Sequence, residues 1–198
     1  MKKTHLVLPL LLLAAALALS ACGGSSPGGG EEAKVEEAIE ESATSSDPSK
    51  CTEFQTAAFN ENESGQKGAA ATKACEEETE AKEDEAETVT VSNVKVDGES
   101  ATAEVEVTGS GLNGQELEVE LAKEGGDWKM NELVGFTKFD GAAFAETLEE
   151  KIGEEEGISP ELAKCVSESL GSVSQEEAEM IVFEKNLEPL EEAAGGCE

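Results

Sequence analysis

The stretch VTVSNVKVDGESATAEVEV (89–107) decides the fold. Its apolar residues alternate with polar ones, a period of two that predicts two strands, each with one buried face. The valines change parity at Ser92-Asn93, so we expect a β-bulge there. Asp97-Gly98 predicts the hairpin turn between the two strands. The residues expected to point inward from the second strand are Ala101, Ala103, Val105 and Val107.

Two further strands continue the pattern, ELEVELA (116–122) and DWKMNELV (127–134), separated by Gly125-Gly126. Together the four strands predict an antiparallel meander with one buried face. Pairing the inward residues Val105 with Val119 and Val107 with Leu117 would place two pairs of glutamates opposite one another. These pairs are Glu104 with Glu120 and Glu106 with Glu118. Like charges in such positions destabilise a sheet, although water and salt reduce the effect on an exposed face.

Helical patterns flank the meander on both sides. Before it, we expect a helix from Ala33, a short helix begun by Asp47-Pro48, a loop at NENESG (60–65), and a third helix over 66–82. After Phe139, apolar spacings of three and four predict further helices, one of them begun by a capping box at Ser174. We expect the helix begun at Ser174 to run through Met180 to Phe183, with Asn186 and Pro189 marking its end.

Helices followed by a curled meander resemble the nuclear transport factor 2-like superfamily, and in particular its secreted bacterial lipoprotein branch. The residues that carry this resemblance are VDGESATAEVEV (96–107) and LAKEGGDWKM (121–130). The resemblance implies an α+β fold over 33–139, in which N-terminal helices pack on a four-stranded cone-like sheet and leave a pocket. A small helical segment over 140–198 follows. We expect Trp128 to be a core residue beside Met130, with a pocket wall as the alternative. The pocket would then be lined by Trp128, Phe54, Phe59, Val105 and Leu121.

The N-terminus predicts export and lipid attachment. Two lysines precede a short apolar run, and Leu19-Ser20-Ala21-Cys22 resembles the lipobox of bacterial lipoproteins. The resemblance implies a signal peptide over 1–21, cleavage before Cys22, and a diacylglyceryl group on the Cys22 thiol. The glycine-rich stretch that follows predicts a tether over 22–32. An ordinary secretory signal with a chance cysteine is the alternative.

The composition excludes several classes of function. The chain has 45 acidic residues, 14 lysines and no arginine, which give a net charge of −31. Such a surface cannot bind nucleic acid, because phosphate contacts need basic side chains. The single histidine, His5, falls in the signal peptide, so the mature chain has no histidine for catalysis or metal ligation. No calcium-loop motif, phosphate loop or nucleotide fingerprint is present, and we expect no metal, no other cofactor and no catalytic residue.

Four cysteines remain besides Cys22, and an even number in an exported chain predicts two disulfides. Three connectivities are open. We favour Cys51–Cys75 and Cys165–Cys197, because each pair falls within one structural segment. Zinc ligation is the competing interpretation, but the chain has no C-x-x-C pair.

These features predict a non-enzymatic binding or scaffolding protein, held on the extracytoplasmic face of the cell membrane by the lipid on Cys22. Its partner would be an envelope protein or a small apolar ligand. Two alternatives remain open. One is a hydrolase or isomerase that uses pocket carboxylates, which a deeply buried Asp or Glu would favour. The other is an acidic surface that binds cations loosely.

Overall fold

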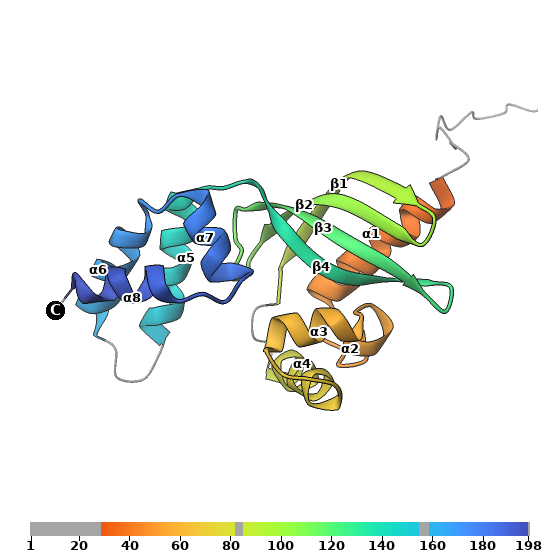
Figure 1. The fold of residues 1–198 in the computed structure, drawn as a ribbon, viewed down its shortest axis with the longest axis horizontal. Helices are drawn as coiled ribbons and strands as arrows, with labels where there is room; N and C mark the ends of the chain where they lie inside the picture. Colours follow the sequence, from red (N-terminus) through yellow and green to blue (C-terminus); the bar gives the residue numbers. More distant parts are fainter. Residues whose placement is uncertain (1–28, 82–84, 155–158, 198) are drawn as a thin grey trace, which may run out of the picture.

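A computed structural model describes residues 29–81, 85–154 and 159–197. The fold is α+β, with one open four-stranded antiparallel sheet between two groups of helices (Figure 1). The predicted signal peptide and Cys22 lie outside the described residues. None of the helices in the described ranges has the length and apolar character needed to cross a bilayer.

The sheet is the predicted meander, with strands β1 (Thr88–Asp97), β2 (Ser100–Thr108), β3 (Glu116–Glu124) and β4 (Asp127–Lys138) in sequential order. The bulge in β1 is confirmed, since the register shifts between Ser92 and Lys95 and Asn93 takes a φ of 52°. The hairpin turn lies one residue later than predicted. Asp97 pairs with Ser100, so Gly98 and Glu99 form the turn.

The predicted register between β2 and β3 is wrong by two residues. Val105 pairs with Leu117, which places Glu104 opposite Glu118 and Glu106 opposite Glu116. The ladder continues to Gln115, a fully buried polar residue just before β3, whose carbonyl accepts from the Val107 N–H at 3.3 Å. Its Nε2 donates to the Asp140 carbonyl at 3.1 Å, and its Oε1 accepts from the Asp140 N–H at 2.9 Å. Glutamates still face one another, but in different pairs.

Strand β4 is bulged three times. Its pairing with β3 shifts at three places, which leaves Asn131, Val134 and Thr137 as extra residues. Each bulge bends a strand and increases its twist. The bulges let Leu133 and Phe136 both pack against the core although their spacing breaks the period of two. β4 therefore curls around one face of the sheet.

Helix α1 (Gly29–Thr44) lies across this curled face and contacts both β1 and β4 (Figure 1). It already includes Gly29, so the tether predicted over 22–32 is too long. Glu31 explains the early start: its carboxylate accepts from Trp128 Nε1 at 2.9 Å and pairs with Lys123 and Lys34. These contacts hold the first turn of α1 against the β3–β4 hairpin.

Three short helices follow, α2 (Lys50–Glu53), α3 (Ala57–Ser64) and α4 (Ala69–Ala81). The single helix expected from Asp47-Pro48 is divided between α2 and α3, and the loop expected at 60–65 is largely helical. The division has a clear cause. Between α2 and α3 the chain pairs with β4, where the Met130 N–H donates to the Phe54 carbonyl and the Thr56 N–H donates to the Met130 carbonyl.

The C-terminal helices are α5 (Gly141–Glu154), α6 (Pro160–Leu170), α7 (Gln175–Val182) and α8 (Glu188–Gly195). The capping box at Ser174 is confirmed. The helix begun there ends at Val182 with Phe183 as its C-cap, as expected. The additional helix α8 was not predicted, and Pro189 lies in its first turn, where the missing N–H has no cost. Four rings join these helices to the sheet through contacts between Phe136, Phe139, Phe144 and Phe183.

We predict that the ion pairs of Glu31 stabilise the fold in a pH-dependent way. Hydrogen bonds from Lys123, Lys34 and Trp128 lower the pKa of Glu31 from 4.5 to about 2. A lowered pKa in the folded chain means that this contribution is complete above about pH 4.5 and disappears as the pH falls toward 2. Urea unfolding at several pH values should therefore show Glu31→Gln to be less stable than wild type at neutral pH, with the difference closing in acid.

The control is Glu36→Gln, which removes the same charge from an exposed position on α1. Protonation of carboxylates in acid also relieves charge repulsion throughout the chain. The control measures how much of the change in stability comes from this general effect. A difference between Glu31→Gln and wild type that does not depend on pH would contradict the prediction.

Candidate functional site

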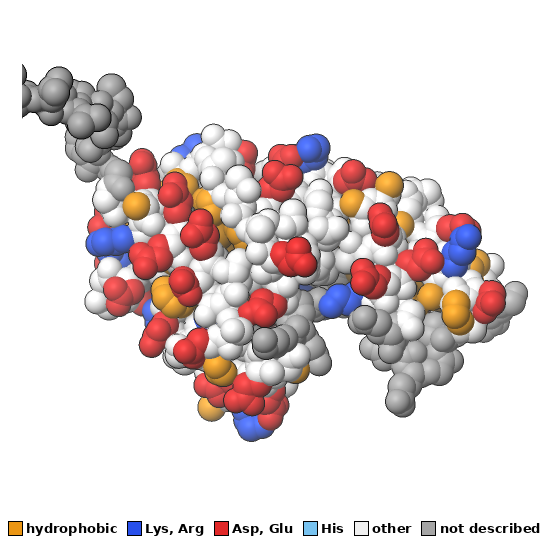
Figure 2. All heavy atoms as spheres, turned by 180° about the vertical axis from the view of Figure 1, so that it is seen from behind, with side chains coloured by type: hydrophobic (Ala, Val, Ile, Leu, Met, Phe, Trp, Pro, Cys, Tyr) orange, Lys and Arg blue, Asp and Glu red, His pale blue; other side chains and the backbone are white. Residues whose placement is uncertain are grey.

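A cleft of about 640 Å³ lies between the inner face of the sheet, the N-terminal helices and the C-terminal helices. In the space-filling view, the surface is hollowed between these two groups of helices (Figure 2). The cleft exists because the curled sheet extends beyond α1 and is not fully covered by it. Its apolar walls come from β2, β3 and β4 on one side and from α5 and α7 on the other. They include Val105, Val107, Leu117, Leu133, Phe144, Leu148 and Val182.

One part of the lining is polar and buried. Six polar residues of the lining have at most 9% of their surface exposed, and one of them, Thr147, lies on α5. The other five come from four helices and the segment between α2 and α3. They are Ser42, Lys50, Gln55, Asn60 and Thr79. The cleft therefore combines a long apolar surface with a small set of polar groups, as ligand sites usually do.

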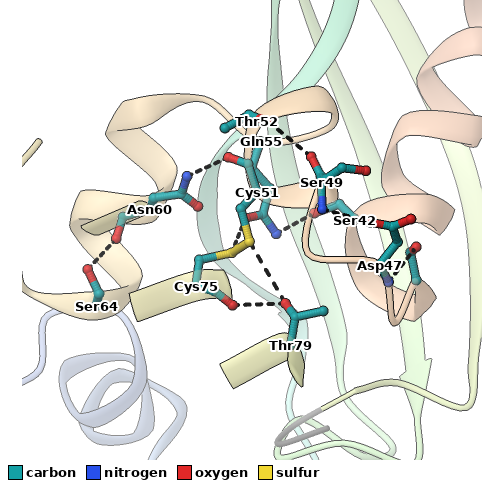
Figure 3. The surroundings of a disulfide bond; sticks show 11 residues. Ser42, Asp47, Ser49, Cys51, Thr52, Gln55, Asn60, Ser64, Cys75 and Thr79 are labelled. Carbon is teal, nitrogen blue, oxygen red and sulfur yellow. Dashed lines mark hydrogen bonds between the residues drawn. A yellow bond between two sulfur atoms is a disulfide. The ribbon is translucent and has the colours of Figure 1, made fainter. Parts of the chain in front are cut away.

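The Cys51–Cys75 disulfide organises these polar groups (Figure 3). It joins α2 to α4, as predicted. Asn60 Nδ2 donates to the Cys51 carbonyl at 2.7 Å, and Thr79 Oγ1 donates to the Cys75 carbonyl at 2.9 Å. Gln55 Nε2 donates to Ser42 Oγ at 3.0 Å, which ties the segment before α3 to α1. The disulfide and these hydrogen bonds thus connect α1, α2, α3 and α4 around one end of the cleft.

Two amide oxygens at this end lack a conventional donor. Asn60 Oδ1 is buried and has no hydrogen-bond partner within the described part of the chain. Gln55 Oε1 lies 3.0 Å from Cys75 Sγ, but a disulfide sulfur carries no hydrogen, so this contact is not a hydrogen bond. A buried acceptor without a donor costs about 1–3 kcal/mol. The packing around the disulfide is strong enough to hold both oxygens in place.

Lys50 is the charged member of the polar end. Only 9% of its surface is exposed, and no carboxylate of the described residues lies within 4 Å of its ammonium. Burial lowers the pKa of this ammonium, while the charges of Glu85 and Glu78 act in the opposite direction. The cleft therefore holds a positive charge on a largely buried side chain, with no carboxylate of the described residues in direct contact.

The residues predicted for a pocket are divided between the cleft and the core. Phe59 and Val105 line the cleft. Leu121 and Trp128 are buried in the core at 0% and 2% exposure, and Phe54 packs against the same core. Trp128 is confirmed as a core residue, and its Nε1 is engaged by Glu31. The structure therefore does not bring these five side chains together around one ligand.

No motif in the sequence marks the polar end of the cleft. Its residues are far apart along the chain and follow no motif, so only the fold brings them together. One signal was present: Gln55 and Asn60 fall among apolar positions close to Cys51, and a disulfide draws its neighbours into the interior.

The outer face of the sheet carries the glutamates that face one another. Glu104 lies opposite Glu118, Glu106 opposite Glu116, and Glu120 opposite Glu132. Neutral or basic groups relieve some of the repulsion, since Asn93 Nδ2 donates to Glu104 at 2.6 Å and Lys138 Nζ donates to Glu116 at 2.6 Å. Within the described ranges, no three or more His, Cys, Asp or Glu side chains are grouped so as to hold a metal ion.

No family model, curated protein or solved structure matches this chain. The resemblance to the nuclear transport factor 2-like superfamily therefore stays a prediction.

The second disulfide, Cys165–Cys197, joins α6 to the chain after α8 and is also the predicted pairing. Neither of its cysteines lines the cleft. It therefore provides a matched control for the function of the first.

We predict that Cys51→Ser/Cys75→Ser lowers the free energy of unfolding by about 3 kcal/mol, because the bridge closes a loop of 24 residues. Cys165→Ser/Cys197→Ser should have a similar effect on stability, since its loop is of similar length. Urea unfolding under oxidising conditions measures both. A loss below about 1 kcal/mol for the first pair would show that the buried contacts hold α2 and α4 without it.

Proposed function

We propose that this chain is a lipid-anchored extracytoplasmic binding protein. The lipid on Cys22 holds it at the membrane, and the cleft takes a small apolar ligand without chemical conversion. The observation that carries the proposal is the cleft itself, an apolar hollow whose walls come from both ends of the chain. Its volume of about 640 Å³ lies within the range of about 300–1,000 Å³ that is usual for small-molecule sites.

The anchor rests on the N-terminal sequence. A charged start, a short apolar run and Leu19-Ser20-Ala21-Cys22 are together typical of a lipoprotein signal. α1 begins by Gly29, which leaves few residues between Cys22 and the domain. A short tether would keep the cleft close to the membrane, where apolar ligands partition.

The enzymatic alternative would use carboxylates in the cleft. Buried Asp or Glu would favour carboxylate catalysis, but the buried polar residues in the described part of the chain include neither. We likewise propose, from the sequence resemblance alone, that 33–139 is a cone-like domain of the nuclear transport factor 2-like kind.

We predict that protein extracted from native membranes carries a diacylglyceryl-sized mass on a chain that begins at Cys22. Reduction should add four hydrogens, two for each disulfide. Intact mass spectrometry measures both changes. An unmodified soluble chain would remove the anchor from the proposal and leave the binding function to be judged on its own.

We predict that the cleft binds N-phenyl-1-naphthylamine, a neutral apolar dye that fluoresces in dry surroundings. Residues 23–198 suffice for this test, because they include every residue that the structure describes. Leu148→Trp should reduce dye affinity about tenfold or more, since a larger side chain at this lining position on α5 fills the cleft.

The matched control is Ala142→Trp, which adds the same side chain at an exposed position on α5. Dye affinity should be unchanged in this variant. Absence of saturable dye binding by the wild-type chain, or equal loss in both variants, would overturn the binding function.

A further inference from the structure

We propose that the ligand of the cleft is a long-chain carboxylate, with its apolar chain along the sheet, α5 and α7 and its acid group at Lys50. This inference rests on the proposed function, because it names the ligand class of the same cleft. It depends on three observations: a largely buried lysine with no carboxylate in direct contact, the charge balance of the lining, and the shape of the apolar walls.

The buried charge comes first. A desolvated ammonium is costly unless an anion or several hydrogen bonds compensate it. Eight of the lysines in the described ranges have a carboxylate within 4 Å. Lys50 has none, although 91% of its surface is buried. Lys95 also has none, but it is exposed to water on β1. Lys50 is therefore the buried cation that an incoming anion would satisfy.

The charge balance of the lining points to the same ligand. The chain has 45 acidic residues and 14 basic ones, yet the described lining contains Lys50, Lys151 and Lys185 against Glu63 and Glu78. Acidic side chains are spread over the rest of the face in Figure 2, and a basic side chain lies at the hollow. The cleft is thus a local exception to the acidity of the surface.

The balance also limits the charge of the ligand. One buried ammonium matches one negative charge, and nearby Glu78 and Glu85 would repel a second. A carboxylate carries one charge, whereas a phosphate monoester carries nearly two at neutral pH. The chain has no arginine that could form bidentate hydrogen bonds with a phosphate.

The apolar walls require a ligand that is mostly hydrocarbon. β2, β3 and β4 provide one wall, and Phe144 and Leu148 of α5 with Val182 of α7 provide the other. Because each methylene buried there is worth about 0.8 kcal/mol, a chain of several methylenes provides most of the affinity. The acid group then provides the selectivity.

The test compares three ligands with the same chain and different head groups: dodecanoate, dodecanol and dodecylamine. Each is titrated, below its micelle-forming concentration and at slightly alkaline pH, into the complex of residues 23–198 with N-phenyl-1-naphthylamine. Dodecanoate should displace the dye at a concentration about tenfold or more below that of dodecanol, because a charge-assisted bond to Lys50 is available only to the acid.

Two variants locate the selectivity. Lys50→Met keeps the length of the side chain and removes its charge, so the preference for dodecanoate over dodecanol, measured as a ratio within this variant, should disappear. Lys95→Met makes the same change on the exposed edge of the sheet and should keep the preference. Circular dichroism checks that each variant is folded. The comparison of the three ligands on the wild-type chain tests the inference even if a variant does not fold.

The outcomes separate this inference from the proposed function. Equal displacement by dodecanol, strongest displacement by dodecylamine, or a preference for dodecanoate that survives Lys50→Met would overturn the carboxylate assignment, although the cleft would still bind apolar ligands. Failure of the dye itself to bind would instead overturn the proposed function and this inference with it.

Discussion

The structure depends on a mismatch in length between two paired strands. β3 spans nine residues and β4 spans twelve, yet they pair along their whole length. The excess can be accommodated only by bulges, and each bulge bends β4 further toward one face. A flat sheet would let α1 cover its inner face completely. The curled sheet instead extends past α1 and meets the C-terminal helices through Phe136 and Phe139, so the cleft follows from the curl.

Two further contacts keep the helices from filling that space. At one end, Glu31 fixes the first turn of α1 to Trp128 and Lys123 on the β3–β4 hairpin. Along the edge strand of the sheet, the chain between α2 and α3 pairs with β4 at Met130. The Cys51–Cys75 disulfide then holds α4 to α2. The N-terminal helices are therefore attached to the sheet by polar and covalent contacts, and their apolar side chains need not meet across the cleft.

Much of this fold could be predicted from the sequence, and the errors have physical causes. Alternating residues predicted the four strands, and the change of parity in β1 predicted its bulge. A change of parity is also present in β4. Its inward residues have even numbers at Trp128 and Met130, an odd number at Leu133 and an even number again at Phe136. The register of β3 could not be predicted from apolar pairing, because the residue opposite Val107 is the buried polar Gln115, whose partner Asp140 is distant in sequence. The polar end of the cleft was hidden for the same reason, since its residues meet only in the fold.

The isolation of Lys50 is informative because of the composition of the chain. In a protein with 45 carboxylates, a lysine finds a partner easily, and most of the described lysines have one within 4 Å. Placing a lysine in a buried wall without a direct carboxylate therefore runs against both the desolvation cost and the abundance of acids. In the proposed complex, an anion in the cleft would provide the direct partner that the described carboxylates do not.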